Sequence, residues 1–167
     1  IRFELFGNDL DDGAVGDHAD LHRVGTDIRK YINSPDSPVY HKSEILYGLY
    51  QALEAIREHH FVYITEGYKD VLAMHAAGFR NTVALCGTAL TEQHITLLSR
   101  YTRYAIIMLD GDEAGQTNGI RSARLLVEKG FSVGRIVLEP EHDPDSLLCM
   151  MGREDFTGYI RRLTRFS

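Results

Sequence analysis

Short apolar runs alternate with helical patterns from residue 61 onward. The runs predict four strands, over residues 61–65, 81–87, 104–109 and 133–140, and the third of these lacks polar alternation, which is typical of a strand buried on both faces. Apolar residues at helical spacing predict helices between the strands, over residues 68–77, 91–101 and 113–129. Strands that alternate with helices in this way indicate an α/β fold with a parallel sheet and right-handed crossovers. Every strand of such a sheet ends at the same edge.

The first sixty residues have a less regular pattern. Residues 1–6 predict a short strand, and the proline-containing residues 33–38 predict an ordered loop or extended connector. Ser43 suits a helix N-cap, and apolar residues at helical spacing follow it, so we expect a helix over residues 43–59. The abrupt start on Ile1 indicates a piece excised from a longer polypeptide.

Composition limits the classes of protein that fit. With 167 residues and 44% hydrophobic content the chain can bury one sizeable core. No apolar run approaches the length of a membrane span and no signal peptide is recognisable, so a cytoplasmic protein without membrane contact is expected. Cys86 and Cys149 lie in apolar contexts and predict reduced core thiols, and no Cys-x-x-Cys pair is present to hold zinc. The net charge of −6 argues against a nucleic-acid partner unless the acids are concentrated in a metal site and the bases are grouped elsewhere.

Acidic residues follow three of the four strands beyond residue 60. They are Glu66 after the first strand, with Asp70 one helical turn beyond it, Asp110 and Asp112 after the third, and Asp143 and Asp145 after the fourth. Two like charges about 5 Å apart repel by roughly 3 kcal/mol at an effective dielectric of about 20, so carboxylates gathered at one edge require cations. Oxygen ligands without His or Cys favour Mg²⁺ or Mn²⁺ over zinc.

Each of these acids also has a purely structural interpretation. Asp-x-Asp alone is a weak signal, because turns favour Asp and Gly. Asp143-Pro144-Asp145 is equally well explained as a helix N-cap with proline at the first helical position, and Glu66 as the partner of a buried arginine. The joint occurrence of the acids at one sheet edge is what favours a metal site.

Three motifs carry a resemblance to a known fold. EGYKD at residues 66–70, LDGDEAG at 109–115 and DPD at 143–145 resemble the acidic motifs of the TOPRIM fold, which primases, topoisomerases and some nucleases share. RKYINSPDSPVYHK, LYGLYQA and LCGTALTEQHITLL are in addition similar to segments of bacterial DnaG-type primases. The resemblance covers Lys30 to about Gly152, which is most of the chain.

The resemblance implies a domain organisation for the chain. Residues 1–60 would be part of an α+β N-terminal subdomain of the primase core, and residues 61–152 a TOPRIM domain with a mainly parallel sheet flanked by helices. Residues 153–167 would begin the C-terminal helical subdomain or form a single helix.

The same resemblance implies a function, which is synthesis of short RNA primers on single-stranded DNA from ribonucleoside triphosphates, by nucleotidyl transfer with two Mg²⁺ or Mn²⁺ ions. Glu66, Asp110 and Asp112 would be catalytic, Asp110, Asp112, Asp143, Asp145 and Glu66 would bind metal, and Asp70 would be a supporting acid. Lys30 and Lys42 match the basic motif of the family and would contact nucleotide or template phosphates, although taken alone they suggest solvated surface lysines. The zinc-binding module and the module that contacts the replicative helicase are missing from these residues, so weak or no activity is expected of them in isolation.

Two other classes of function remain open. A TOPRIM nuclease or topoisomerase domain would use the same acids to cleave a phosphodiester, but a topoisomerase needs a nucleophilic tyrosine that the nine tyrosines do not identify. A non-catalytic module that binds Mg²⁺ and senses nucleotides would keep the fold for protein contacts. The KYINSP segment favours the primase interpretation over a nuclease or topoisomerase.

Overall fold

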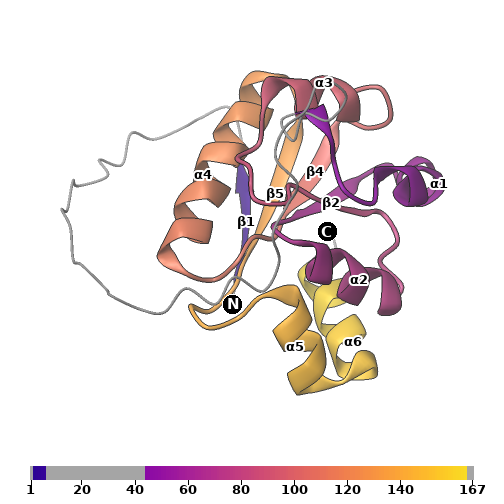
Figure 1. Ribbon diagram of the computed structural model, residues 1–167, viewed down its shortest axis with the longest axis vertical. Coiled ribbons are helices and arrows are strands. Elements are labelled where there is room, and N and C mark those ends of the chain that lie inside the picture. The colour runs from indigo at the N-terminus through magenta and orange to yellow at the C-terminus, as the bar shows by residue number, and fades with distance from the viewer. Residues whose placement is uncertain (1, 7–43, 165–167) are drawn as a thin grey trace.

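A five-stranded sheet with helices on both faces makes up the computed structural model, which describes residues 2–6 and 44–164 (Figure 1). Lys30 and Lys42 lie outside the described residues. The strand order is β1-β5-β4-β2-β3, with bounds Arg2–Phe6 for β1, Val62–Thr65 for β2, Thr82–Ala84 for β3, Tyr104–Ile107 for β4 and Ser132–Val137 for β5. Strands β2 to β5 are mutually parallel, as the alternation of strands and helices predicts.

Six helices cover the two faces of this sheet in the described part of the chain. Their bounds are Leu49–His59 for α1, Tyr68–Ala76 for α2, Glu92–Leu98 for α3, Glu113–Glu128 for α4, Pro144–Met151 for α5 and Arg153–Leu163 for α6. Helices α1, α3 and α4 share one buried apolar cluster, and α2, α5 and α6 share another. Successive residues of the strands contribute to opposite clusters, Ile64 to the first and Tyr63 to the second, because side chains alternate across a sheet. The α/β class with a mainly parallel sheet flanked by helices is therefore confirmed.

The chain's first strand joins the edge of this same sheet. Strand β1 runs antiparallel to β5, with Glu4 opposite Arg135. The sequence predicts this strand but not its neighbour. Helix α1 packs into the buried cluster that α3 and α4 share, through Ala52 and Ile56. Two elements of residues 1–60 are therefore joined to the elements that follow, β1 through strand pairing and α1 through the core. The domain limits at residues 60 and 152 stay predictions.

The helix expected over residues 43–59 is shorter in the structure. It begins at Leu49, because Tyr47 instead forms a β-bridge with Ala84, with N···O distances of 3.0 and 3.1 Å in the two directions. Gly48 follows with a φ of 79°, a left-handed conformation that separates the bridge from the helix and favours glycine. A tertiary contact thus overrides the local helical spacing.

The second half of the molecule brings one further correction. Cys149 was expected in the core together with Cys86, but it lies exposed on α5, while Cys86 is buried. At the end of the described chain, α6 buries Phe156 and Ile160 against the sheet face that α2 and α5 cover. No helix among the described residues is long and apolar enough to cross a membrane.

Candidate metal centre at the carboxyl edge of the sheet

The acids that follow β2, β4 and β5 lie close enough to influence one another's ionisation. The pKa of Asp110 is raised to about 7, first by burial and then by the negative charges of four neighbouring carboxylates, Glu66, Asp70, Asp143 and Asp112. These groups come from three separate segments, which follow β2, β4 and β5. The structure therefore brings together the acids that the sequence places at the ends of the strands.

Two glycines of the DGDEAG segment allow the loops to approach so closely. The backbone N–H of Gly111 donates to the carbonyl of His142, 2.9 Å away, and a Cβ at Gly111 would overlap the backbone of Glu139. A Cβ at Gly115 would overlap the carbonyl of Asp110, so the first turn of α4 rests directly on that residue. The loop after β4 is thus held between α4 and the loop after β5.

Asp112 and Asp143 are both helix N-caps. Oδ1 of Asp112 accepts from the N–H of Gly115 at 2.7 Å, and Oδ1 of Asp143 accepts from the N–H of Ser146 at 2.6 Å. The N-cap interpretation that the sequence offers for Asp143 is therefore correct. It leaves room for a ligand role, because a carboxylate has two oxygens with about four acceptor sites.

Asp70 is the most deeply buried of the acids, with 4% of its surface exposed. Its Oδ2 accepts from the N–H of Gly67 at 2.8 Å, at the start of α2. Burial raises the pKa of Asp70 to about 6, helped by the charges of Asp143 and Asp145 and opposed by hydrogen bonds from the backbone N–H groups of Gly67 and Asp145. Asp145 in turn lies 4.0 Å from Nζ of Lys69. Asp70 thus ties the loop after β2 to the beginning of α5.

Glu66 and Asp110 each have one carboxylate oxygen that could bind a ligand. Oε2 of Glu66 and Oδ1 of Asp110 are buried without a hydrogen-bond partner in the part of the chain that the structure describes. A buried unsatisfied acceptor costs about 1–3 kcal/mol, and more when it is charged. The pKa of Glu66 is raised by burial and by the charge of Asp112, against a hydrogen bond from the Asp110 backbone. Both residues are therefore unfavourable as anions without a cation.

Such unpaired carboxylate oxygens fit a hard divalent cation such as Mg²⁺ or Mn²⁺. Over residues 2–6 and 44–164 no three His, Cys, Asp or Glu side chains already surround one point as metal ligands.

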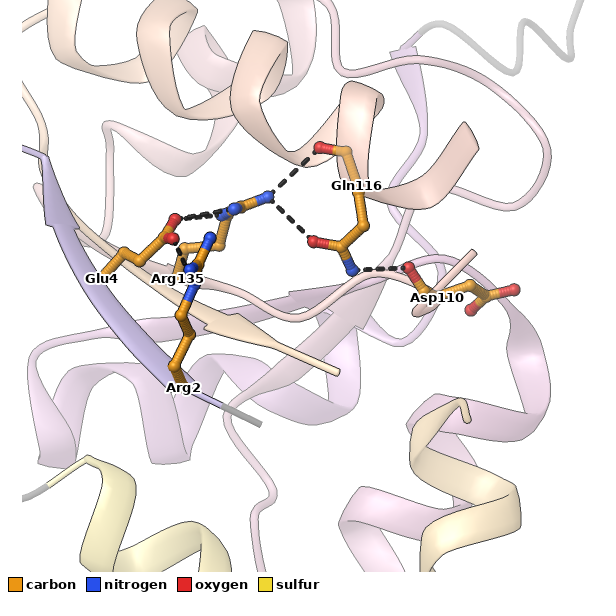
Figure 2. A network of polar contacts seen from close by, with 5 residues as sticks. All are labelled: Arg2, Glu4, Asp110, Gln116 and Arg135. Carbon is orange, nitrogen blue, oxygen red and sulfur yellow. Dashed lines mark hydrogen bonds and ion pairs between the residues drawn. The ribbon is translucent and has the colours of Figure 1, made fainter. Parts of the chain in front are cut away.

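The structure adds two residues that the sequence analysis did not single out. Nε2 of Gln116 donates to the carbonyl of Asp110 at 3.3 Å, and Arg135 of β5 donates to Gln116 (Figure 2). One signal for Arg135 was present, since a single arginine interrupts the otherwise apolar run VGRIV. A charge inside a strand covered on both faces needs a partner in the interior.

Comparisons with known proteins assign this fold and acidic edge to a family. The family model described as Toprim-like matches residues 63–148, about half of the chain, and a second model, described as DNA primase catalytic core, N-terminal domain, matches residues 22–53. The chain therefore belongs to the Toprim-like family. Its homologues in that family are bacterial DNA primases of the DnaG type.

Three comparisons, two of them with the primase of Aquifex aeolicus, illustrate the similarity. The DNA primase of Aquifex aeolicus is 43% identical over 138 residues, which are 83% of this chain and 27% of that protein. The crystal structure of the zinc-binding and RNA polymerase domains of the Aquifex aeolicus primase superposes with a TM-score of 0.72 at 42% identity, over 84% of this chain and 34% of that one. The structure of the DnaG primase catalytic domain bound to single-stranded DNA gives a TM-score of 0.70 at 35% identity, over 83% of this chain and 44% of that one.

The match covers most of this chain but a much smaller share of each relative. The chain spans about a quarter of the length of the curated primases that it matches. What is similar is thus the part of a primase catalytic core that contains the Toprim-like sheet.

Proposed function

We propose that this chain is part of the catalytic core of a DNA primase, which synthesises short RNA primers on a single-stranded DNA template by metal-assisted nucleotidyl transfer. The proposal rests on two buried carboxylate oxygens, one of Glu66 and one of Asp110, that have no hydrogen-bond partner within residues 2–6 and 44–164. They lie inside a cluster of acids from three strand ends. Primase homology over about four-fifths of the chain supports it.

The reaction joins the 3′-hydroxyl of one nucleotide to the α-phosphate of the next and releases pyrophosphate. Negative charge builds on the attacking oxygen, the phosphate and the leaving group, and two bound Mg²⁺ or Mn²⁺ ions would supply the compensating positive charge. Asp110, Asp112, Asp143, Asp145 and Glu66 would hold the cations. Glu66 would also accept the proton of the hydroxyl, a role that its pKa, raised by burial, favours, and Asp70 would support the cluster.

We assign binding of the substrates to residues that lie between β1 and α1 in the sequence. Lys30 and Lys42, with single positive charges, would contact phosphates of the template or of the incoming ribonucleoside triphosphate. The solved DnaG catalytic domain bound to single-stranded DNA supports DNA as the template partner. Contact with the replicative helicase would be made by a module outside these residues, and the 167 residues alone should make little primer.

Dinucleotide synthesis by the full-length parent protein on single-stranded DNA tests the proposal. Glu66→Gln and Asp110→Asn should each reduce synthesis at least a hundredfold. Glu113→Gln should leave synthesis unchanged, because the Glu113 side chain is exposed in the first turn of α4. Synthesis by Asp110→Asn at the wild-type rate would refute the proposed site, and phosphodiester cleavage in place of synthesis would favour a TOPRIM nuclease.

A further inference from the structure

A buried positive charge lies in the sheet a short distance from the acidic edge. Arg135 occupies the middle of β5, and its side chain is 5% exposed. An arginine cannot lose its charge in a protein, so its burial requires acceptors for its N–H groups. The partners that satisfy it form a connected chain of polar contacts (Figure 2).

Glu4 of β1 supplies the negative charge. Nε and Nη2 of Arg135 both donate to Oε2 of Glu4, at 2.9 and 2.6 Å. The other oxygen, Oε1, is paired with Nε of Arg2 at 2.7 Å. Because Glu4 lies directly opposite Arg135 in the strand register, the pairing of β1 with β5 fixes this ion pair.

Gln116 of α4 satisfies the remaining terminal nitrogen. Nη1 of Arg135 lies 3.2 Å from both the carbonyl oxygen and Oε1 of Gln116. Arginine only donates hydrogen bonds, so Gln116 must present its amide oxygen to Arg135. Its amide nitrogen is then directed to the carbonyl of Asp110, at 3.3 Å. The orientation of this amide is set from both sides.

We propose that Gln116 is a positioning residue for the divalent cation at the acidic edge, and that Arg135 and Glu4 hold it in place. This inference rests on the proposed function, because it assumes that Asp110 binds the cation. Oδ1 of Asp110 has no hydrogen-bond partner among the described residues, so the direction of the carboxylate depends on how the Asp110 backbone is held. Gly115 fits against the carbonyl of Asp110, and Gln116 donates to that same oxygen.

The arrangement gives the first strand of the chain a functional role. Glu4 lies more than a hundred residues before Asp110 in the sequence, and the side chains of Arg135 and Gln116 connect it to the Asp110 backbone. A role limited to packing would change the stability of the fold without changing the affinity for metal. A positioning role would change the affinity for metal, whatever its effect on stability. Metal affinity measured beside stability therefore separates the two.

The decisive variants remove the donor that Asp110 receives. Gln116→Met keeps a side chain of similar length but removes the amide. Gln116→Glu still accepts from Arg135, yet an ionised carboxylate cannot donate to the Asp110 carbonyl. Arg2→Gln is the control, because Arg2 is 72% exposed and pairs with the oxygen of Glu4 that Arg135 does not use.

Binding of Mn²⁺ to the full-length parent can be measured by the electron paramagnetic resonance signal of free Mn²⁺, with urea unfolding of each variant in parallel. Both Gln116 variants should bind Mn²⁺ roughly tenfold more weakly, as is typical when a partner of a ligating group is removed. Arg2→Gln should bind as wild type. Arg135→Lys, which keeps the charge but loses the fork of donors, should weaken binding in the same direction.

The outcomes distinguish this inference from the proposed function. If Asp110→Asn loses Mn²⁺ binding while both Gln116 variants keep wild-type affinity, Gln116 does not position the site and the inference is wrong. If Asp110→Asn itself binds Mn²⁺ like the wild type, the proposed metal site is wrong. Weakened affinity in the Gln116 variants with unfolding midpoints near that of Arg2→Gln would support the positioning role.

Discussion

The backbone N–H of Asp110 donates a hydrogen bond to the carboxylate of Glu66, across two neighbouring parallel strands. The bond joins the ends of β2 and β4, where each residue also has a buried carboxylate oxygen without a partner among the described residues. This contact favours the ionised form of Glu66, whereas burial and the charge of Asp112 oppose it. The properties of this pair lead to testable predictions.

Divalent metal should stabilise the protein. A ligand that binds only the folded state adds RT ln(1 + [L]/Kd) to the unfolding free energy, about 2.7 kcal/mol at a hundred times Kd. The melting temperature should therefore rise with added Mg²⁺ or Mn²⁺. Asp110→Asn combined with Asp112→Asn should abolish the rise, whereas Glu113→Gln should retain it. A double variant that responds to metal like the wild type would show that cations bind elsewhere.

Without metal, stability should fall as the pH rises. The carboxyl of Asp110 has a pKa raised from 3.8 to about 7, and that of Asp70 a pKa raised from 3.8 to about 6. A carboxyl with a raised pKa binds more protons in the folded state than in the unfolded state. Its contribution therefore destabilises the fold progressively as the pH rises from its pKa in the unfolded state to its pKa in the folded state. The loss is at most about 1.4 kcal/mol per pH unit for each carboxyl.

Urea unfolding with a chelator present, from about pH 4 to about pH 8, measures this dependence. Asp110→Asn cannot ionise at position 110, so its stability should fall less steeply than that of the wild type. Equal slopes for the two proteins would mean that Asp110 ionises in the fold as easily as in the unfolded chain.

Gly111→Ala should destabilise the protein strongly. A Cβ at this position would overlap the backbone of Glu139, so the loops after β4 and β5 would have to separate. We expect a loss above about 2 kcal/mol together with weaker metal binding. Gly158→Ala, inside α6, is the matched control. A Cβ at Gly158 would meet no described atom within 4 Å apart from its chain neighbours and the backbone of its own helix. That change should stabilise by up to about 1 kcal/mol. Equal stability of the two variants in thermal unfolding would contradict the close approach at Gly111.

Lys30 and Lys42 should affect binding of phosphates without affecting metal. Replacing either lysine with alanine in the full-length parent should weaken template binding and reduce the slope of log K against log salt by about 0.7, the release of one counterion from a single strand. The metal-induced rise in melting temperature should persist. Glu66→Gln should do the opposite, with template affinity retained and primer synthesis lost. Lys129→Ala, which removes a surface lysine paired with Glu92, serves as the control. Unchanged salt slopes for both lysine variants would support the interpretation of Lys30 and Lys42 as surface lysines without a binding role.

Local patterns in the sequence determined the strands, most helices and the placement of the acids. Strands β2 to β5 appear where short apolar runs predict them, because a strand buried on both faces is apolar at most of its positions. Glu66, Asp110 and Asp143 follow three of those strands, and parallel pairing brings the ends of such strands to one edge. The acidic edge could therefore be predicted from the sequence, although the roles of its members remain proposals.

Only the tertiary structure decided features that depend on distant partners. The pairing of β1 with β5, the start of α1 at Leu49 and the burial of Arg135 between Glu4 and Gln116 each join residues far apart in the sequence. Tyr47 leaves the helical pattern because Ala84 offers backbone hydrogen bonds, and Cys149 is exposed although its neighbours are apolar. A periodic pattern shows which face of an element is apolar. It does not show which element lies against that face, because that choice depends on how the whole chain satisfies its buried polar groups.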